Sequence, residues 1–482
     1  MFDDVREGMS RPQRDHATIL DGRVNNRQLR HSTTRSTLVK QNASAERLRQ
    51  CQRQGHRPME EITMSGITRR ESTALIGSAL LSSTFPALAQ NQPPIKIGFS
   101  MALSGGLAGG GKAALLTYQI WAEEMNAKGG LLGRKIELVY YDDQSSPATV
   151  PAIYSKLLDI DKVDLVISGY ATVPTAAAMP TVIQHKKVFL SLFALALNDQ
   201  FKYDRYFQLQ PNGPTAKTEI SRGFYEIASA MTPKPKTIAF TGADAEYSQL
   251  ALEGARINAK KYGMKIVYDR TYPSNTVDFA SIMRPIKAAS PDLIFLASYP
   301  PDSAGLVRAA YDVGIKAQLF GGGTIGLQFA TFKQQLNTML NNVVSYDLYV
   351  PEKTMNFPGI EQLLVRYRER AKAAGVDPLG IYIPPFAYAE MQVLEQAIKA
   401  TNSIDDGKLA EYMHKSTFKT VVGDIRFSPE GEWAKPRILL VQYQNIVGSD
   451  VEQFKQAGKQ VIIYPPELKS GTVRTPFDAT HR

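Results

Sequence analysis

The stretch SGGLAGGGKAALL, residues 104–116, has the spacing of a phosphate-binding loop, with Gly106, four residues, Gly111 and Lys112. Such a loop needs a Ser or Thr after the lysine to hold magnesium. Ala113 stands there instead, so the sequence argues against a nucleotide site. Two readings remain: a plain strand-to-helix turn, or a loop that offers backbone N–H groups and a helix N-terminus to an anion at the edge of a cleft. We favour the second.

Catalytic and metal-binding patterns are missing from the sequence. Three of the six histidines lie in the first 63 residues, and the others are isolated from one another. Asp142 and Asp143 end an expected strand, where carboxylates more often cap a turn than act as acids. The sequence has no Gly-x-Ser-x-Gly nucleophile motif. We therefore expect a protein that is not an enzyme and that needs no cofactor and no metal.

Two tyrosines stand at equivalent places in the second half of the chain. Tyr247 and Tyr299 each come just after an expected strand. Taken singly, either tyrosine could instead be an ordinary core or surface residue. At matching strand ends, the pair indicates a pocket wall.

The elements that must position these residues alternate between strands and helices. Such alternation is typical of βαβ units, a parallel sheet and helices on both faces. After a pause at YFQLQPNGPTAK the pattern restarts, which predicts two similar α/β lobes. A late strand over 437–444 is expected to return to an earlier sheet. The expected strands of the two series cover residues 95–103, 135–143, 164–169, 188–194, 237–243, 265–272, 293–298 and 318–323.

The N-terminal part reads as an export signal. Arg69 and Arg70 precede a short apolar run, and Ala87-Leu88-Ala89 fits a small-x-small cleavage site. The arginine pair favours the twin-arginine route, with the general secretory route and a membrane anchor as alternatives. Residues 64–89 are thus a predicted signal peptide cleaved after Ala89. Residues 1–63 are expected to be disordered, and Met64 is the suspected true start.

Composition narrows the class of partner. The formal net charge is +10, but half of this excess lies in residues 1–89. The remainder has no strong basic stripe, so we expect no nucleic-acid partner. The single cysteine, Cys51, excludes a disulfide within the chain.

Several long stretches resemble a known family. EEMNAKGGLLGRKIELVYYDDQSSP is the most specific, and TGADAEYSQLALEGAR, DFASIMRPIKAASPDLIFLASYPPDSAGLVRAAYDVGIK and VVGDIRFSPEGE continue the likeness. They resemble the Leu/Ile/Val-type (branched-chain amino-acid-binding) periplasmic substrate-binding proteins of bacterial ABC importers, over about Pro94 to Gly448. The resemblance implies a type I periplasmic binding protein: α/β, with two doubly wound parallel-sheet lobes joined by three crossings.

The resemblance also implies domain limits and partners. Lobe 1 would comprise 94–210 plus 346–420, and lobe 2 would comprise 211–345 plus 421–465; 466–482 would be a loose tail. The protein would be a periplasmic monomer that closes on a small-molecule ligand by hinge motion and meets ABC permease and ATPase subunits.

The resemblance further implies which residues contact the ligand. The loop with Tyr170, Ala171 and Thr172 matches the family's carboxylate-binding loop, and Tyr247 and Tyr299 match its second-lobe aromatic contacts. The next carboxylate-contacting loop matches Phe193, Ala194 and Leu195. Gly323, followed by Thr324, stands where the family has the acid that holds a ligand ammonium, and Gly110 where it has an aromatic residue.

These departures shape the expected ligand. Without an acid at Gly323, a desolvated ammonium would be costly, so a carboxylate without a free α-ammonium is expected. The missing side chains at Gly110 and Gly323 would leave room for a bulky or aromatic ligand. The alternatives are an ordinary amino acid, with Asp244, Glu246 or Asp302 supplying the acid, or a ligand-sensing receptor without transport.

Overall fold

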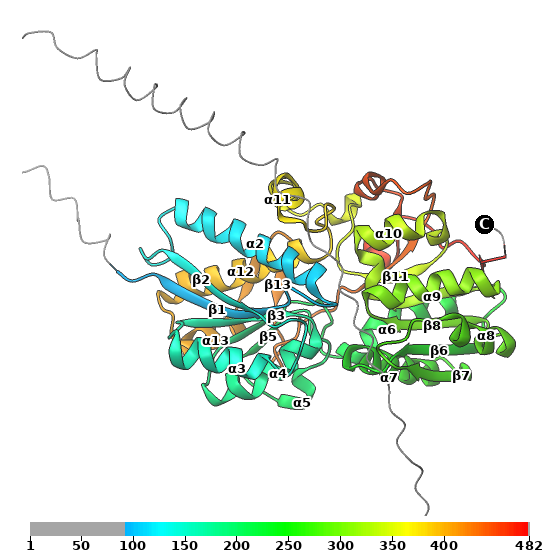
Figure 1. The fold of residues 1–482 in the computed structure, drawn as a ribbon, viewed down its shortest axis with the longest axis horizontal. Coiled ribbons are helices and arrows are strands. Elements are labelled where there is room, and N and C mark those ends of the chain that lie inside the picture. Colours follow the sequence, from blue (N-terminus) through cyan, green and yellow to red (C-terminus); the bar gives the residue numbers. More distant parts are fainter. Residues whose placement is uncertain (1–91, 481–482) are drawn as a thin grey trace, which may run out of the picture. The chain divides into compact units, whose positions relative to one another are not determined.

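The computed structural model describes residues 92–480. The predicted leader, signal peptide and cleavage site all lie outside the described residues. The described part contains two main sheets, each covered by helices, and the chain passes between them at residues 209–215, 348–359 and 427–438. We call the part around the first sheet lobe 1 and the part around the second lobe 2 (Figure 1).

The lobe 1 sheet is parallel throughout, in the order β2-β1-β3-β4-β5. Every residue of β3 and β4 is buried, as expected for central strands covered on both faces. The four expected strands of this lobe are confirmed. The strands are β1 (Ile95–Met101), β2 (Ile136–Asp142), β3 (Leu165–Tyr170), β4 (Phe189–Leu192) and β5 (Tyr206–Gln208).

Strand β5 falls in the stretch that the sequence pattern reads as a pause. It has only three residues and includes a polar one, Gln208, which is fully buried. The Gln208 amide donates to the Tyr206 hydroxyl over 2.9 Å and to the carbonyl oxygen of Ala194. Side-chain hydrogen bonds thus satisfy a buried amide that local hydrophobicity alone would exclude.

Two helical layers cover the lobe 1 sheet (Figure 1). The apolar side chains of α2 and α12 pack in one core cluster and those of α3 and α4 mainly in another, because successive strand residues face opposite sides of the sheet. No helix among residues 92–480 is both long enough and apolar enough to cross a membrane. The helices of this lobe are α2 (Ala108–Ala127), α3 (Val150–Ser155), α4 (Thr172–Gln184), α11 (Ile360–Ala374), α12 (Ile383–Thr401) and α13 (Asp406–Lys415).

The lobe 2 sheet has seven strands in the order β15-β14-β11-β10-β8-β6-β7. The expected return of a late strand is confirmed, since β14 pairs antiparallel with β11. The strands are β6 (Thr237–Ala243), β7 (Lys265–Tyr272), β8 (Leu293–Ser298), β10 (Leu319–Thr324), β11 (Val344–Asp347), β14 (Leu439–Tyr443) and β15 (Gln460–Tyr464). The main helices are α6 (Ala216–Ser229), α7 (Glu246–Lys261), α8 (Ala280–Ala289) and α9 (Pro300–Val313).

Element membership departs from the expected lobe limits in two places. Strand β11 runs past the expected boundary at residue 345 and belongs wholly to the lobe 2 sheet. The hairpin of β12 (Thr417–Thr420) and β13 (Gly423–Arg426) packs on the lobe 1 helices α12 and α13, although residues from 421 onward were assigned to lobe 2. Because the two strands of a hairpin pair with each other, the boundary between the lobes does not fall between β12 and β13.

The expectation of a loose tail is wrong for residues up to 480. Strand β16 (Phe477–Asp478) pairs antiparallel with β9 (Lys316–Ala317). Phe477 is buried and stacks on Phe320, with ring centroids 4.4 Å apart. A two-residue strand pairing and one buried ring hold this segment, and neither leaves a periodic signal in the sequence.

Candidate ligand-binding site

Two lobe 1 loops, after β3 and β4, carry backbone strain at the carboxyl edge of the sheet. Ala171 has φ 84° and Phe193 has φ 64°, a region that residues with a β-carbon seldom adopt. The side-chain oxygen of Thr172 accepts the backbone N–H of Leu195 over 3.2 Å. That bond ties the two loops together and helps hold their strained backbone in place.

A small polar pocket lies where these loops meet lobe 2. Ligands in open parallel sheets bind beyond the carboxyl ends of the strands, and this pocket has that position. It is lined by residues of both lobes and leaves about 10 Å³ for the centre of a water molecule, room for about one water. Its lining residues are Tyr170, Ala171, Thr172, Phe193, Gln210, Tyr247, Tyr299, Ile325, Tyr346 and Tyr382.

Aromatic side chains make up most of this wall. The rings of Tyr247 and Tyr299 meet edge to face, with centroids 5.8 Å apart. The Tyr299 hydroxyl also accepts the backbone N–H of Tyr247 over 3.3 Å. The hydroxyls of Tyr346 and Tyr382 lie 3.1 Å apart. The expectation that Tyr247 and Tyr299 lie together is confirmed.

Burial disfavours the ionised form of these tyrosines further. Loss of solvent, the largest cause in each case, raises the pKa of Tyr170, Tyr247 and Tyr299 above its ordinary value. The same cause raises the pKa of Tyr346 and Tyr382. Each hydroxyl therefore stays protonated near neutral pH and can donate one hydrogen bond.

The helix N-termini around the pocket differ in charge. Helix α4 begins at Thr172, and its first turn holds no acidic residue and no side-chain cap. Helices α7 and α9 carry Glu246 and Asp302 in their first turns. Because a helix N-terminus is partly positive, α4 is the one of these three whose positive end lacks its own carboxylate.

Two of the three acidic residues near the pocket contact other side chains. Burial raises the pKa of Asp302 to about 6, and its carboxylate accepts the Tyr272 hydroxyl over 3.3 Å. The exposed Asp244 contacts the Gln249 amide. Burial also raises the pKa of the half-buried Glu246. None of the three is among the lining residues of the pocket.

The structure brings together six of the residues singled out from the sequence and separates the others. Ala194 and Leu195 are fully buried, and the carbonyl oxygen of Ala194 accepts the Gln208 amide. The hydroxyl of Thr324 pairs with that of Ser345 over 2.9 Å. The six lining residues are Tyr170, Ala171, Thr172, Phe193, Tyr247 and Tyr299.

The space expected beside the two glycines is already filled. A β-carbon built at Gly110 would lie 2.3 Å from the ring of Tyr170. One built at Gly323 would lie 3.3 Å from the Tyr247 hydroxyl, which donates to the Gly323 carbonyl over 3.1 Å. Neither glycine therefore leaves an empty hole in the polar pocket, although Gly110 also lines a separate cavity of about 200 Å³.

Four lining residues were missed from the sequence. Tyr346 lies on β11, a strand the pattern did not reveal, and Tyr382 precedes α12. Gln210 lies in the stretch read as a pause, just after β5. Ile325 follows β10 directly, and only its place after an expected strand could have marked it.

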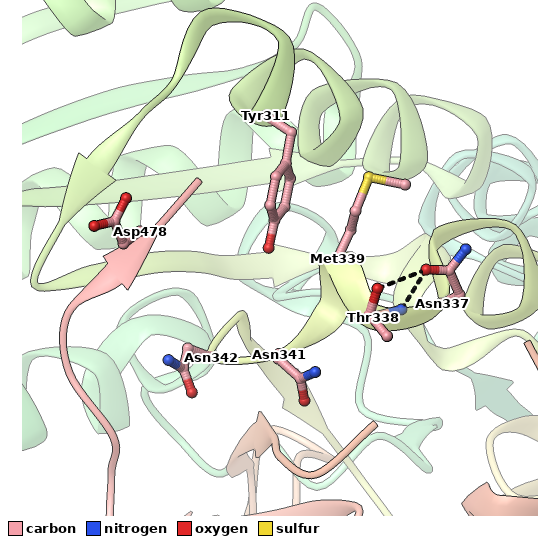
Figure 2. A pocket seen from close by; sticks show the side chains of 7 residues that line it. All are labelled: Tyr311, Asn337, Thr338, Met339, Asn341, Asn342 and Asp478. Carbon is pink, nitrogen blue, oxygen red and sulfur yellow. Dashed lines mark hydrogen bonds between the residues drawn. The ribbon is translucent and has the colours of Figure 1, made fainter. Parts of the chain in front are cut away.

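Another cavity lies at the opposite, amino-terminal edge of the lobe 2 strands. It measures about 450 Å³ and is lined by Tyr311, Asn337, Thr338, Met339, Asn341, Asn342 and Asp478. Figure 2 shows the Asn337 side chain turned onto the adjacent Thr338. The amides of Asn341 and Asn342 donate to the carbonyl oxygens of Ile446 and Pro476. These polar groups brace the end of the lobe, away from the carboxyl ends of the strands.

Known proteins share this architecture. The Leu/Ile/Val-binding protein of Escherichia coli K12 is 23% identical over 369 residues, which cover 74% of this chain and 92% of that protein. The branched-chain amino acid transporter substrate binding protein of Streptococcus pneumoniae, solved with isoleucine, is 22% identical with a TM-score of 0.62, covering 73% and 97%. A solute binding protein of an ABC transporter from Rhodopseudomonas palustris, solved with 3,4-dihydroxybenzoic acid, is 19% identical with a TM-score of 0.61, covering 74% and 94%.

The solved structures share the fold of type I periplasmic binding proteins, and the two mainly parallel sheets of this chain agree with it. A family model described as periplasmic binding protein matches residues 94–446, most of the chain. The expected family and fold class are confirmed: the chain belongs to the periplasmic binding protein family.

Proposed function

We propose that this protein is the periplasmic solute receptor of an ABC importer, and that its ligand is a small carboxylate without a free α-ammonium. The observation that carries the proposal is the chemistry of the polar pocket. The first residue of α4, whose first turn holds no acidic residue, lines the same space as five tyrosines, and no carboxylate lines that space.

The carboxylate would lie at the loop of Ala171 and Thr172. The backbone N–H groups of Thr172 and Val173 have no partner within the helix and suit an anion, whereas Pro174 has no N–H to offer. The Thr172 hydroxyl accepts from Leu195, so its own hydrogen stays free to point to the ligand. Gln210 adds an amide donor, and the hydroxyl of Tyr299, which accepts from the Tyr247 N–H, keeps its own hydrogen to donate.

The absence of an acid among the lining residues argues against an ammonium. A desolvated ammonium needs a paired negative charge, because an unpaired one is costly to bury. Tyrosine hydroxyls and the Gln210 amide offer only neutral acceptors. An aromatic or otherwise bulky carboxylate would instead stack on the rings, each good pair adding about 0.5–1.5 kcal/mol.

Ligand entry requires movement. The pocket as it stands has room for about one water, whereas ligand pockets usually measure about 300–1,000 Å³. Three crossings between lobes allow opening and closing with little twist. We infer that the protein is exported through a twin-arginine signal cleaved after Ala89. In the periplasm it would be a monomer that closes on its ligand. The closed protein would then meet the permease and ATPase subunits. The ligands named for two structural neighbours, isoleucine and 3,4-dihydroxybenzoic acid, both contain a carboxylate.

One observation favours an amino acid as the alternative ligand. Glu246 begins α7 beside the lining residue Tyr247, and burial raises the pKa of its half-buried carboxyl. After opening, this carboxylate could hold an ammonium. A sensing receptor without transport would use the same pocket and differ only in its partner.

A thermal-shift screen separates these ligands. Leucine and valine are compared with benzoate and other simple carboxylates, because a ligand at about 100 times its Kd stabilises the protein by about 2.7 kcal/mol. We expect stabilisation by carboxylates and none by leucine. The reverse result would establish the amino-acid alternative, and a Glu246→Gln variant that loses leucine binding would identify the acid.

A further inference from the structure

A second chamber adjoins the polar pocket, and its chemistry is different. It measures about 200 Å³, twenty times the free space of the polar pocket by the same measure. No charged side chain lines it. Its lining residues are Gly106, Leu107, Gly109, Gly110, Tyr170, Pro300, Phe329, Thr331 and Phe332.

Tyr170 is the one residue that lines both spaces. Its ring lies against Gly110, so close that a β-carbon there would come within 2.3 Å of it. The ring therefore stands as a partition between the pocket and the chamber. Only a glycine at position 110 permits this placement.

An aromatic wall continues past the partition. In the polar pocket, the ring of Phe193 lies 5.3 Å from that of Tyr382. Tyr382 in turn lies 5.5 Å from Phe329, which lines the chamber. A ligand that passes Tyr170 would thus stay in contact with aromatic rings along its whole length.

We propose that the chamber is the tail subsite of an elongated ligand: a carboxylate whose apolar tail displaces the Tyr170 ring and fills the chamber. The inference rests on the proposed function, which supplies the carboxylate end at α4. A cavity of about 150 Å³ accommodates benzene, so the chamber has room for a phenyl ring. Its volume and its uncharged lining select ligand length, while the loop at Thr172 selects the charge.

The test is a length series of probes measured by calorimetry: benzoate, phenylacetate, 3-phenylpropionate and 4-phenylbutyrate. Each added methylene that becomes buried should tighten binding about fourfold, equivalent to about 0.8 kcal/mol. We expect affinity to rise along the series until the chamber is full.

Variants at Gly109 assign the gain to the chamber. A β-carbon at Gly109 would lie 3.9 Å from Phe329, an ordinary contact, and the further methyl groups of a valine would take up space in the chamber beside that ring. Gly109→Val should abolish the gain with length and leave benzoate affinity unchanged. Gly109→Ala, the matched control, should keep most of the gain.

The outcomes separate the inference from the proposed function. If benzoate binds but affinity stays flat along the series, the chamber is not a tail subsite, and the proposed function stands. A gain that survives Gly109→Val also overturns the inference. If none of the four carboxylates binds while leucine does, the proposed function fails and the tail subsite fails with it.

Discussion

The hydroxyl of Tyr247 donates a hydrogen bond to the carbonyl oxygen of Gly323 over 3.1 Å. A β-carbon at Gly323 would lie 3.3 Å from that same hydroxyl. Tyr247 begins the buried face of α7 and Gly323 lies on the central strand β10. The tyrosine thus occupies the space that an acidic side chain at position 323 would need, which links the neutral character of the pocket to one packing contact.

Replacing Tyr247 with Phe should show how much the hydrogen bond from Tyr247 to Gly323 contributes to the stability of the fold. The Gly323 carbonyl loses its side-chain donor in a buried setting, so we expect the free energy of unfolding to fall by about 1–3 kcal/mol. Urea unfolding measures the change. Tyr268→Phe on β7 is the control, because that half-buried residue packs at the edge of the core, and the control should unfold like the unmodified protein. Equal midpoints for both variants would contradict the expectation.

Removing the Thr172 hydroxyl should weaken carboxylate binding. Thr172→Val takes away a hydrogen bond to a charged group, which is worth about 1.5–3 kcal/mol, or about 10- to 150-fold in Kd. The change also leaves the Leu195 N–H without its acceptor. Calorimetry with the best carboxylate of the screen gives the Kd. Thr172→Ser keeps the hydroxyl and should bind nearly as well; a serine variant as weak as the valine variant would argue that the methyl group matters instead.

Glu390 should make stability depend on pH. It is fully buried on α12, its Oε2 accepts the Tyr118 hydroxyl, and its Oε1 has no partner among the described residues. Burial raises its pKa to about 8. The folded chain therefore holds a proton that the unfolded chain has lost between about pH 4.5 and 8, so stability falls as pH rises through that window.

Glu390→Gln should remove this dependence. The stability of the unmodified protein should decline relative to the variant by up to about 1.4 kcal/mol per pH unit within the window. Melting temperatures recorded from pH 5 to 8.5 test it. The exposed Glu369, changed to Gln, serves as the control and should leave the slope unaltered. Parallel curves for the unmodified protein and Glu390→Gln would rule out the buried proton.

The C-terminal segment should contribute to the stability of lobe 2. Phe477→Ala removes a buried ring that stacks on Phe320, and such truncations cost about 3–5 kcal/mol. Urea unfolding should show the loss, whereas Thr475→Ala at an exposed position should change little. If the two variants unfold alike, β16 is not part of the stable core.

The predicted export signal implies that the periplasmic protein lacks residues 1–89. Arg69, Arg70 and the Ala87-Leu88-Ala89 site predict that periplasmic protein begins at or near Gln90. N-terminal sequencing of periplasmic material checks this. A sequence that begins upstream of Met64 in that material would refute the signal.

The sequence by itself determined the elements whose signals are local. The apolar runs of β1, β3, β6 and β8 carry enough periodicity to be recognised, and the parallel-sheet rule then places the residues that follow them at one edge. That reasoning placed Tyr247 and Tyr299 at one pocket wall, whereas Thr172 was implied by the family resemblance. It works because strand direction and side-chain alternation are properties of short segments.

Only the tertiary structure decided how that pocket is filled. Gln210, Tyr346 and Tyr382 come from segments without a strong local pattern, and the chain crossings bring them in from distant positions. Tyr170 and Tyr247 lie against Gly110 and Gly323 and fill the polar pocket there, so the room that remains beside Gly110 lies in the separate chamber instead. The physical reason is close packing: whether a glycine leaves a cavity depends on which distant side chain lies against it, and no local periodicity records that contact.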